Sequence, residues 1–155
     1  MLLSSWFFPQ NKSNIPFSKM SFPLNFNIRY EYDSLRSGIF VPVTLRMGEM
    51  AIPCDAEIDT GSQVCVFQRE LGVSLAIDIE AGHRIILSSL GGAVVAFGHS
   101  VTLHTLGLEF HSIVYFAEEY NLPRNLLGRN GWLQKLRLAV VDYDAEIYLN
   151  SYDAT

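Results

Sequence analysis

Apolar and polar residues alternate along most of the chain, with the period of two that marks half-buried β-strands. The alternation first appears over 26–32, where aromatic and aliphatic residues are separated by Asn, Arg and Glu. It returns over 39–47 and over 50–58, and only Gly48-Glu49 separates these two stretches. A connection this short predicts that 39–47 and 50–58 form a β-hairpin.

The middle of the chain continues the pattern around a pair of glycines. Apolar residues alternate again over 73–79 and predict a further strand, whereas 68–72 is ambiguous. Residues 84–88 and 93–97 are β-prone arms on either side of Gly91-Gly92. This arrangement predicts a second hairpin with a mobile tip, because glycine leaves the backbone free.

The last third of the chain predicts four more strands, at 101–106, 108–116, 138–141 and 145–149. Residues 98–100, Gly-His-Ser, are expected to separate the first of these from the glycine hairpin. Asn130 is a candidate N-cap for a short amphipathic helix over 132–137.

Many short strands, regular turns and one short helix near the end indicate an all-β domain. The 155 residues suit a single domain, and a hydrophobic content of 49% with 17% charged residues predicts a folded core. Residues 1–25 are rich in Ser, Asn, Pro and Phe and lack periodicity. We therefore expect a flexible N-terminal arm over 1–25 and a domain over 26–155.

The charge of the chain and the length of its apolar runs argue against several classes of partner. The net charge of −5 and the absence of a basic run argue against a nucleic-acid surface. No apolar run approaches the roughly 20 residues of a membrane helix. The apolar start over 1–8 is too short for a secretion signal and lacks its basic region. We therefore expect a cytoplasmic protein with no nucleic-acid and no membrane partner.

Most familiar catalytic or metal-binding patterns are missing. Cys54 and Cys65 fit neither a zinc pattern nor a redox pair, and their apolar surroundings predict buried free thiols rather than a disulfide. The four histidines form no ligand pair, so we expect no metal and no cofactor. Ser62 lacks a nucleophile elbow, and Gly91-Gly92 lacks the Lys and the helix of a phosphate loop.

The Asp-Thr-Gly-Ser segment at 59–62 interrupts the β pattern between the apolar runs 50–58 and 64–67. Asp and Gly both disfavour strands. One interpretation is a carboxylate held on a sharp turn at the end of a buried strand. The other is an ordinary turn between two strands.

Three features in order give the chain a resemblance to a known family. The segment 59–62, preceded by Ala-Glu-Ile, resembles the active-site motif of aspartic proteases. Leu-Leu-Gly-Arg-Asn at 126–130 resembles the second signature of the retropepsin-like branch, in which two apolar residues, Gly and Arg open a short helix. The glycine hairpin between them lies where that family has its flap. The resemblance covers 39–149 and excludes the N-terminal arm.

The resemblance implies a fold and a reaction. The expected fold is a closed or partly open β-barrel with a flap hairpin and one short C-terminal helix. The expected activity is aspartic endopeptidase cleavage of polypeptides, in which two carboxylates share one proton around a water molecule. The chain has a single Asp-Thr-Gly. The resemblance therefore implies a homodimer that brings together the Asp59 side chains of two copies.

The roles of the motif residues follow from the resemblance. Asp59 would supply the catalytic carboxylate, and Thr60 would form a hydrogen bond across the dimer axis. Gly61 would let its backbone N–H approach the carboxylate, and the Ser62 side chain would form a hydrogen bond to it.

Two further segments would complete the site. The flap tip, closing over the bound peptide, would comprise Leu90, Gly91, Gly92 and Ala93. The segment packed behind the active-site loop would comprise Leu126, Leu127 and Gly128. Arg129 would anchor the short helix to that loop.

The chain departs from the family pattern at Gln63, where many viral relatives have an acidic residue that pairs with the signature Arg. Arg129 must therefore pair with Asp55, with Glu57 or with backbone carbonyls. Two alternatives to the protease stay open. One is a catalytically inactive domain of the same fold that binds peptides or dimerises, and the other is a monomeric β-barrel in which Asp-Thr-Gly arose by chance.

Overall fold

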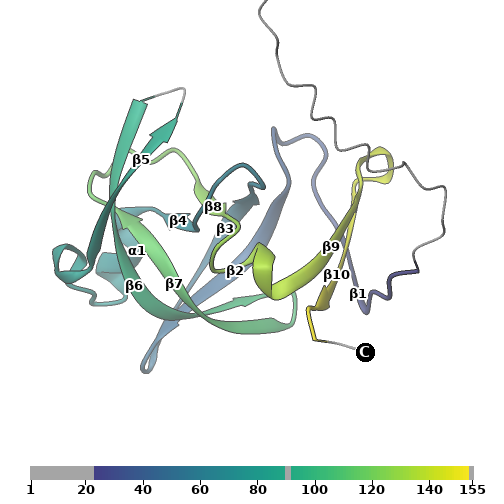
Figure 1. Ribbon diagram of the computed structural model, residues 1–155, viewed down its shortest axis with the longest axis horizontal. Helices are drawn as coiled ribbons and strands as arrows, with labels where there is room; N and C mark the ends of the chain where they lie inside the picture. The colour runs from purple at the N-terminus through teal and green to yellow at the C-terminus, as the bar shows by residue number, and fades with distance from the viewer. Residues whose placement is uncertain (1–22, 90–91, 154–155) are drawn as a thin grey trace, which may run out of the picture.

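Most of the chain is β-strand. The computed structural model describes residues 23–89 and 92–153, of which strands make up 55% and helical segments 12%. The strands form one seven-stranded and one three-stranded sheet (Figure 1). This composition confirms the predicted all-β class.

Six strands of the larger sheet close into a barrel. In order around the barrel these strands are β2 (Phe40–Met47), β3 (Met50–Ile58), β8 (Asn125–Leu127), β4 (Val66–Phe67), β7 (Leu108–Ala117) and β6 (Gly92–Thr105). Antiparallel pairing of β2 with β6 closes the ring, so the barrel is closed rather than partly open. Strand β5 (His83–Ser89) pairs only with β6, and the β5–β6 hairpin projects from the barrel (Figure 1).

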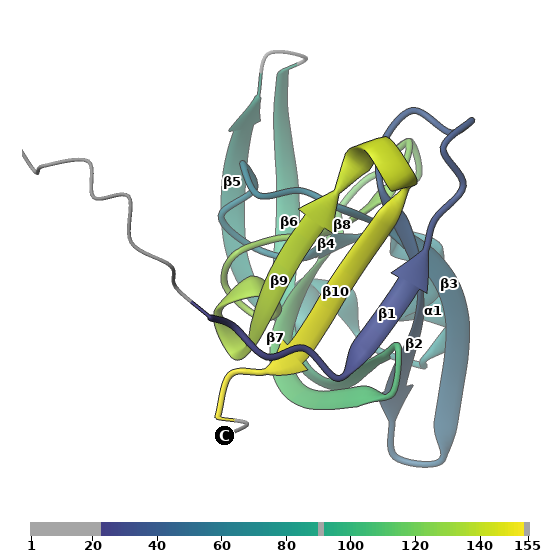
Figure 2. The ribbon, with the colours of Figure 1, turned by 90° about the vertical axis from the view of Figure 1, so that its right-hand side faces the viewer.

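The smaller sheet joins the two ends of the described chain. Its strands are β1 (Ile28–Glu31), β10 (Glu146–Ser151) and β9 (Leu136–Val141), all antiparallel, and Figure 2 shows them side by side. An ion pair between Arg29 and Glu146 links β1 to β10. Strand β1 is shorter than the predicted 26–32, although the Asn27 N–H still donates to the carbonyl of Leu149.

The β2–β3 hairpin confirms the prediction for 39–58. Val41, Val43 and Leu45 alternate along β2, and each is buried in the core. Pro42 lies on β2 just outside the stretch that pairs with β6, where its missing N–H costs no ladder bond. Its carbonyl accepts a hydrogen bond of 2.8 Å from the Thr105 hydroxyl.

The predicted strand over 73–79 is wrong. This segment belongs to α1 (Arg69–Ser74) and, after a short connection, to the 3-10 turn η1 (Ile79–Ala81). Val73 is 51% exposed, whereas Leu75 and Ile79 are buried. The spacing of Leu75 and Ile79 fits one face of a helical segment as well as one face of a strand, so alternation alone was misleading.

The predicted break at 98–100 is also wrong, because β6 runs through it without interruption. A Cβ at Gly98 would lie 2.8 Å from the Tyr115 ring on the neighbouring strand β7. The His99 Nε2 atom lies 2.8 Å from the carbonyl oxygen of Ile79. Glycine therefore marks a close approach inside a continuous strand rather than its end.

The predicted C-terminal helix over 132–137 is reduced to a 3-10 turn, η2 (Leu133–Lys135), and its N-cap is Trp132 rather than Asn130. Gly131 has a φ of +100°, and Trp132, with φ −138° and ψ −67°, is neither helical nor extended, so the chain turns sharply just before η2. Leu136 already begins β9. A third 3-10 turn, η3 (Asp142–Asp144), occupies the predicted turn before β10.

The core fills the barrel and extends under the smaller sheet. Its largest fully buried side chains come from the strands, from η1 and from the N-cap of η2, and include Trp132, Phe67, Phe116, Leu45, Ile79, Leu103, Leu127, Ile147 and Leu149. The same core cluster contains Tyr32 and Leu136, so the two sheets share one core.

Candidate active site

The Asp59 loop connects β3 to β4. It begins where β3 ends, and its backbone is held from the first residue, since the Asp59 N–H donates to the carbonyl oxygen of Leu127 across 3.0 Å. Leu127 is the last residue of β8, which runs parallel to β3. The strand behind the loop therefore fixes the point at which the chain leaves the sheet.

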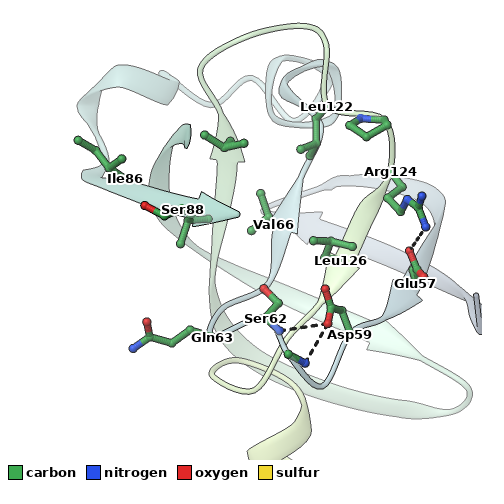
Figure 3. A pocket seen from close by; sticks show the side chains of 14 residues that line it. Glu57, Asp59, Ser62, Gln63, Val66, Ile86, Ser88, Leu122, Arg124 and Leu126 are labelled. Carbon is green, nitrogen blue, oxygen red and sulfur yellow. Dashed lines mark hydrogen bonds and ion pairs between the residues drawn. The ribbon is translucent and has the colours of Figure 1, made fainter. Parts of the chain in front are cut away.

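The Asp59 carboxylate is bound by its own loop. Its Oδ1 atom accepts hydrogen bonds from the backbone N–H of Gly61 at 2.9 Å and of Ser62 at 3.1 Å (Figure 3). A Cβ at Gly61 would come within 3.2 Å of the same oxygen. Glycine thus permits the close approach of its N–H, as the sequence predicted, and the side chain of Asp59 is fixed in one direction.

The Ser62 side chain differs from its predicted role. Its hydroxyl donates to the carbonyl oxygen of Val64 at 2.8 Å and forms no hydrogen bond with the Asp59 carboxylate within the described chain. A hydroxyl has one proton, and here it stabilises the loop backbone instead. Thr60 is exposed on the turn of the loop, and its predicted bond across a dimer axis stays a prediction.

The 126–130 segment packs behind the loop, as the sequence predicted. Leu127 is fully buried, and a Cβ at Gly128 would overlap the carbonyl of Val64. The N–H of Arg129 donates to the Ser62 carbonyl at 2.9 Å, and that of Asn130 to the Gln63 carbonyl at 2.8 Å. Backbone bonds therefore join the two motifs directly.

Within the described chain, the Arg129 side chain binds none of the partners that the sequence predicted for it. Asp55 pairs with Arg36 at 2.9 Å and Glu57 pairs with Arg124 at 2.6 Å. Arg129 is exposed, and its guanidinium makes no hydrogen bond or ion pair with any residue that the structure describes. The anchoring between the two motifs comes from the backbone N–H of this residue rather than from its charge.

A pocket of about 680 Å³ opens beside the Asp59 carboxylate, a volume within the range of ligand sites. Its lining residues come from the end of β3, the Asp59 loop, β4, the β5–β6 hairpin, and β8 with the segment before it (Figure 3), namely Glu57, Asp59, Gly61, Ser62, Gln63, Val66, Ile86, Leu87, Ser88, Val94, Leu122, Pro123, Arg124 and Leu126. Val66, Val94 and Leu126 give it an apolar floor and wall, so an extended apolar segment would bury surface here.

The β5–β6 hairpin contributes to the pocket through its arms. Ile86, Leu87 and Ser88 line the pocket from β5, and Val94 does so from β6. Of the predicted tip, Leu90 and Gly91 lie outside the described residues. Gly92 and Ala93 begin β6, are exposed and are not among the residues that line the pocket.

The sequence did not identify Glu57 and Arg124 as a pair within the pocket. The Arg124 Nη1 atom lies 2.6 Å from the Glu57 Oε2 atom, on the side of the pocket that also carries Leu126 (Figure 3). The position of Glu57, two residues before Asp59 in the sequence, was the one signal available. Arg124 stands in a loop far along the chain, so only the parallel pairing of β3 with β8 brings it near.

Neither a metal-binding cluster nor a membrane-spanning helix is present in the described part of the chain. Residues 23–89 and 92–153 contain no cluster of three or more His, Cys, Asp or Glu side chains arranged to hold a metal ion. The same residues contain no helix that is long and apolar enough to cross a membrane. In comparisons with known proteins, no protein-family model and no curated protein matched this chain.

Proposed function

We propose that the protein is a retropepsin-like aspartic endopeptidase that hydrolyses peptide bonds as a homodimer. The observation that carries the proposal is the Asp59 carboxylate, which two loop N–H groups orient at the wall of a pocket. The closed barrel and the β5–β6 hairpin agree with the fold that the sequence motifs imply.

The chemistry needs two carboxylates around one water molecule. Two carboxyl groups a few ångströms apart cannot both ionise, because their negative charges repel, so one of them keeps its proton. The ionised carboxylate takes a proton from water, and the protonated one polarises the carbonyl of the substrate. The pair titrates as a unit.

The second carboxylate would come from a second copy of the chain. Within one copy, the other carboxylate that lines the pocket is Glu57. Glu57 is engaged in an ion pair with Arg124, so its carboxylate already has a partner other than Asp59. Two-fold symmetry would instead place two Asp59 side chains together.

The pocket suits an extended peptide. The β5–β6 hairpin forms one wall and the 122–126 segment forms the other, so a strand-like segment would lie across the Asp59 loop between them. Closure of the hairpin over the peptide would exclude water from the reaction.

The proposal is tested with a degenerate library of synthetic dodecapeptides, whose cleavage products are identified by mass spectrometry. The wild-type protein should cleave a subset of peptides, and Asp59→Asn should cleave none while keeping the wild-type circular dichroism and melting temperature. A statine-type transition-state mimic should inhibit the wild type. Cleavage by Asp59→Asn at the wild-type rate would overturn the mechanism. A folded wild type that binds peptides without cleaving any would favour an inactive peptide-binding domain.

A further inference from the structure

We propose that the Glu57–Arg124 pair is a specificity subsite that selects a peptide with an acidic side chain next to the scissile bond. This inference rests on the proposed function for its substrate, a polypeptide, and adds to it the chemistry of one side chain. It follows from the position, the exposure and the remaining hydrogen-bonding capacity of the pair.

The pair lies where a substrate side chain would meet it. Glu57, Asp59 and Arg124 are the three charged residues among those that line the pocket within the described chain. Glu57 lies near the end of β3, two residues before Asp59, and Figure 3 shows the pair and Asp59 on the same side of the pocket. A peptide lying across the Asp59 loop therefore has a side chain within reach of the pair.

Arg124 is the accessible member of the pair. The Arg124 side chain is 45% exposed, whereas that of Glu57 is 18% exposed. The Glu57 carboxylate packs against Gly38, where a Cβ would overlap it, and Arg124 covers its other side. An incoming side chain would thus meet the guanidinium before the carboxylate.

Arg124 also has donors to spare. One nitrogen, Nη1, donates to the Glu57 carboxylate, and the structure assigns the guanidinium no further hydrogen bond among the described residues. A guanidinium carries five N–H donors in a planar fork that matches a carboxylate. A bound Glu or Asp side chain would take two of these donors while Glu57 keeps its own bond.

The rest of the pocket sharpens the selection. Apart from Asp59, the lining residues nearest the pair in sequence or on β8 are apolar, namely Leu122, Pro123 and Leu126. Charge-assisted hydrogen bonds are stronger in such partly water-excluded surroundings. A basic side chain would face the guanidinium directly and would be disfavoured by charge repulsion, because the Glu57 carboxylate is already paired with Arg124.

The test compares matched peptides taken from a cleaved member of the dodecapeptide library. The peptides differ only at the position that contacts the pair, which carries Glu, Gln or Lys. For the wild type, kcat/KM for the Glu peptide should exceed that for the Lys peptide by at least about tenfold, as one charge-assisted hydrogen bond provides.

Two substitutions should move this ratio in opposite directions. Arg124→Gln removes the guanidinium and leaves the Glu57 charge unpaired, so the ratio should fall to about one or invert in favour of Lys. Glu57→Gln frees Arg124 and should raise the ratio. The matched control is Arg36→Gln, which removes a similarly exposed arginine that pairs with Asp55 and does not line the pocket. It should keep the wild-type ratio.

Binding to Asp59→Asn separates this inference from the proposed catalysis. The same peptides, labelled with a fluorophore, should bind this variant in the same order of affinity, and adding Arg124→Gln should abolish the order. If the wild type cleaves no peptide, the matched peptides are built instead on a library member that binds Asp59→Asn; if this binding order is then found, the proposed function fails and the subsite stands. If the wild type cleaves Glu and Lys peptides equally, or with a ratio that Arg124→Gln leaves unchanged, the subsite is overturned and the proposed function stands.

Discussion

The backbone N–H of Asp59 donates to the carbonyl oxygen of Leu127 across 3.0 Å, so the two motifs that the sequence singles out are hydrogen-bonded to each other. Two further N–H groups, those of Arg129 and Asn130, return bonds to the carbonyls of Ser62 and Gln63. The Asp59 loop is thus held by the backbone of the 126–130 segment on both of its sides. Backbone geometry behind the loop, rather than an ion pair, determines where the carboxylate lies.

Replacing Gly128 should damage the site through this geometry. In Gly128→Ala the new Cβ would overlap the Val64 carbonyl and lie 2.9 Å from the Ser62 carbonyl oxygen, so the loop must shift. We expect a loss of about 2 kcal/mol or more in the free energy of unfolding, measured in urea, as for other overpacked sites.

Gly48→Ala is the control for this prediction. Gly48 has nothing within 4 Å of an added Cβ, but its φ of +56° disfavours alanine. The Gly48→Ala substitution should lower the free energy of unfolding by only about 1 kcal/mol. Equal losses of unfolding free energy in the two variants would contradict the prediction, because the Asp59 loop would then tolerate a displacement of the 126–130 segment.

Stability below about pH 4.5 should depend on Glu146. A hydrogen bond from Arg29, with a second one from Tyr148, lowers the pKa of the Glu146 carboxyl from 4.5 to about 2. A lowered pKa in the folded protein gives a stabilisation that is complete above about pH 4.5 and is lost as the pH falls toward 2. Acid should therefore weaken the link between β1 and β10.

The measurement compares melting temperatures of the wild type and Glu146→Gln at about pH 7, 4 and 2.5. The variant should melt below the wild type at neutral pH, and the gap should narrow steadily as the pH falls. A gap that stays constant over this range would contradict the assignment of the low pKa to Glu146. Glu49→Gln changes an exposed carboxylate in the β2–β3 turn and is a suitable control.

Both cysteines should resist thiol reagents in the folded protein. Burial raises the pKa of the Cys54 and Cys65 thiols to about 12, so almost no thiolate is present at neutral pH. Reaction with Ellman's reagent at about pH 8 should be slow, and both thiols should react at once in guanidinium chloride. Rapid reaction of either thiol in the native protein would contradict this expectation.

The sequence predicted the strands best where one face of a strand is buried. The 39–58 hairpin is correct because its alternation and its tight turn point to the same structure. The strand predicted over 73–79 was wrong because the spacing of Leu75 and Ile79 fits a helical segment equally well. In addition, Gly72 lets the α1–η1 segment approach Phe116 closely. Local pattern could not decide between these two structures, because contacts with β7 determine the outcome.

Parts of the site were predictable from the motifs. The bond from the Gly61 N–H to the Asp59 carboxylate follows from the Asp-Thr-Gly motif, and the packing of 126–130 behind the loop was expected from the family resemblance, whereas the bond from the Ser62 N–H was not foreseen. The Glu57–Arg124 pair depends on the pairing of β3 with β8, and no local signal encodes it. The strand β8 itself escaped prediction since three residues are too short for a detectable alternation.

The most direct test of the proposed dyad mixes wild-type chains with Asp59→Asn chains at a constant total concentration. The mixtures are unfolded and refolded together so that subunits exchange, and cleavage of one library peptide is measured. If each active site needs Asp59 from two copies, activity should fall with the square of the wild-type fraction, to about a quarter at equal amounts of the two chains. A linear fall, to about half, would mean that each chain acts alone and would contradict a shared active site.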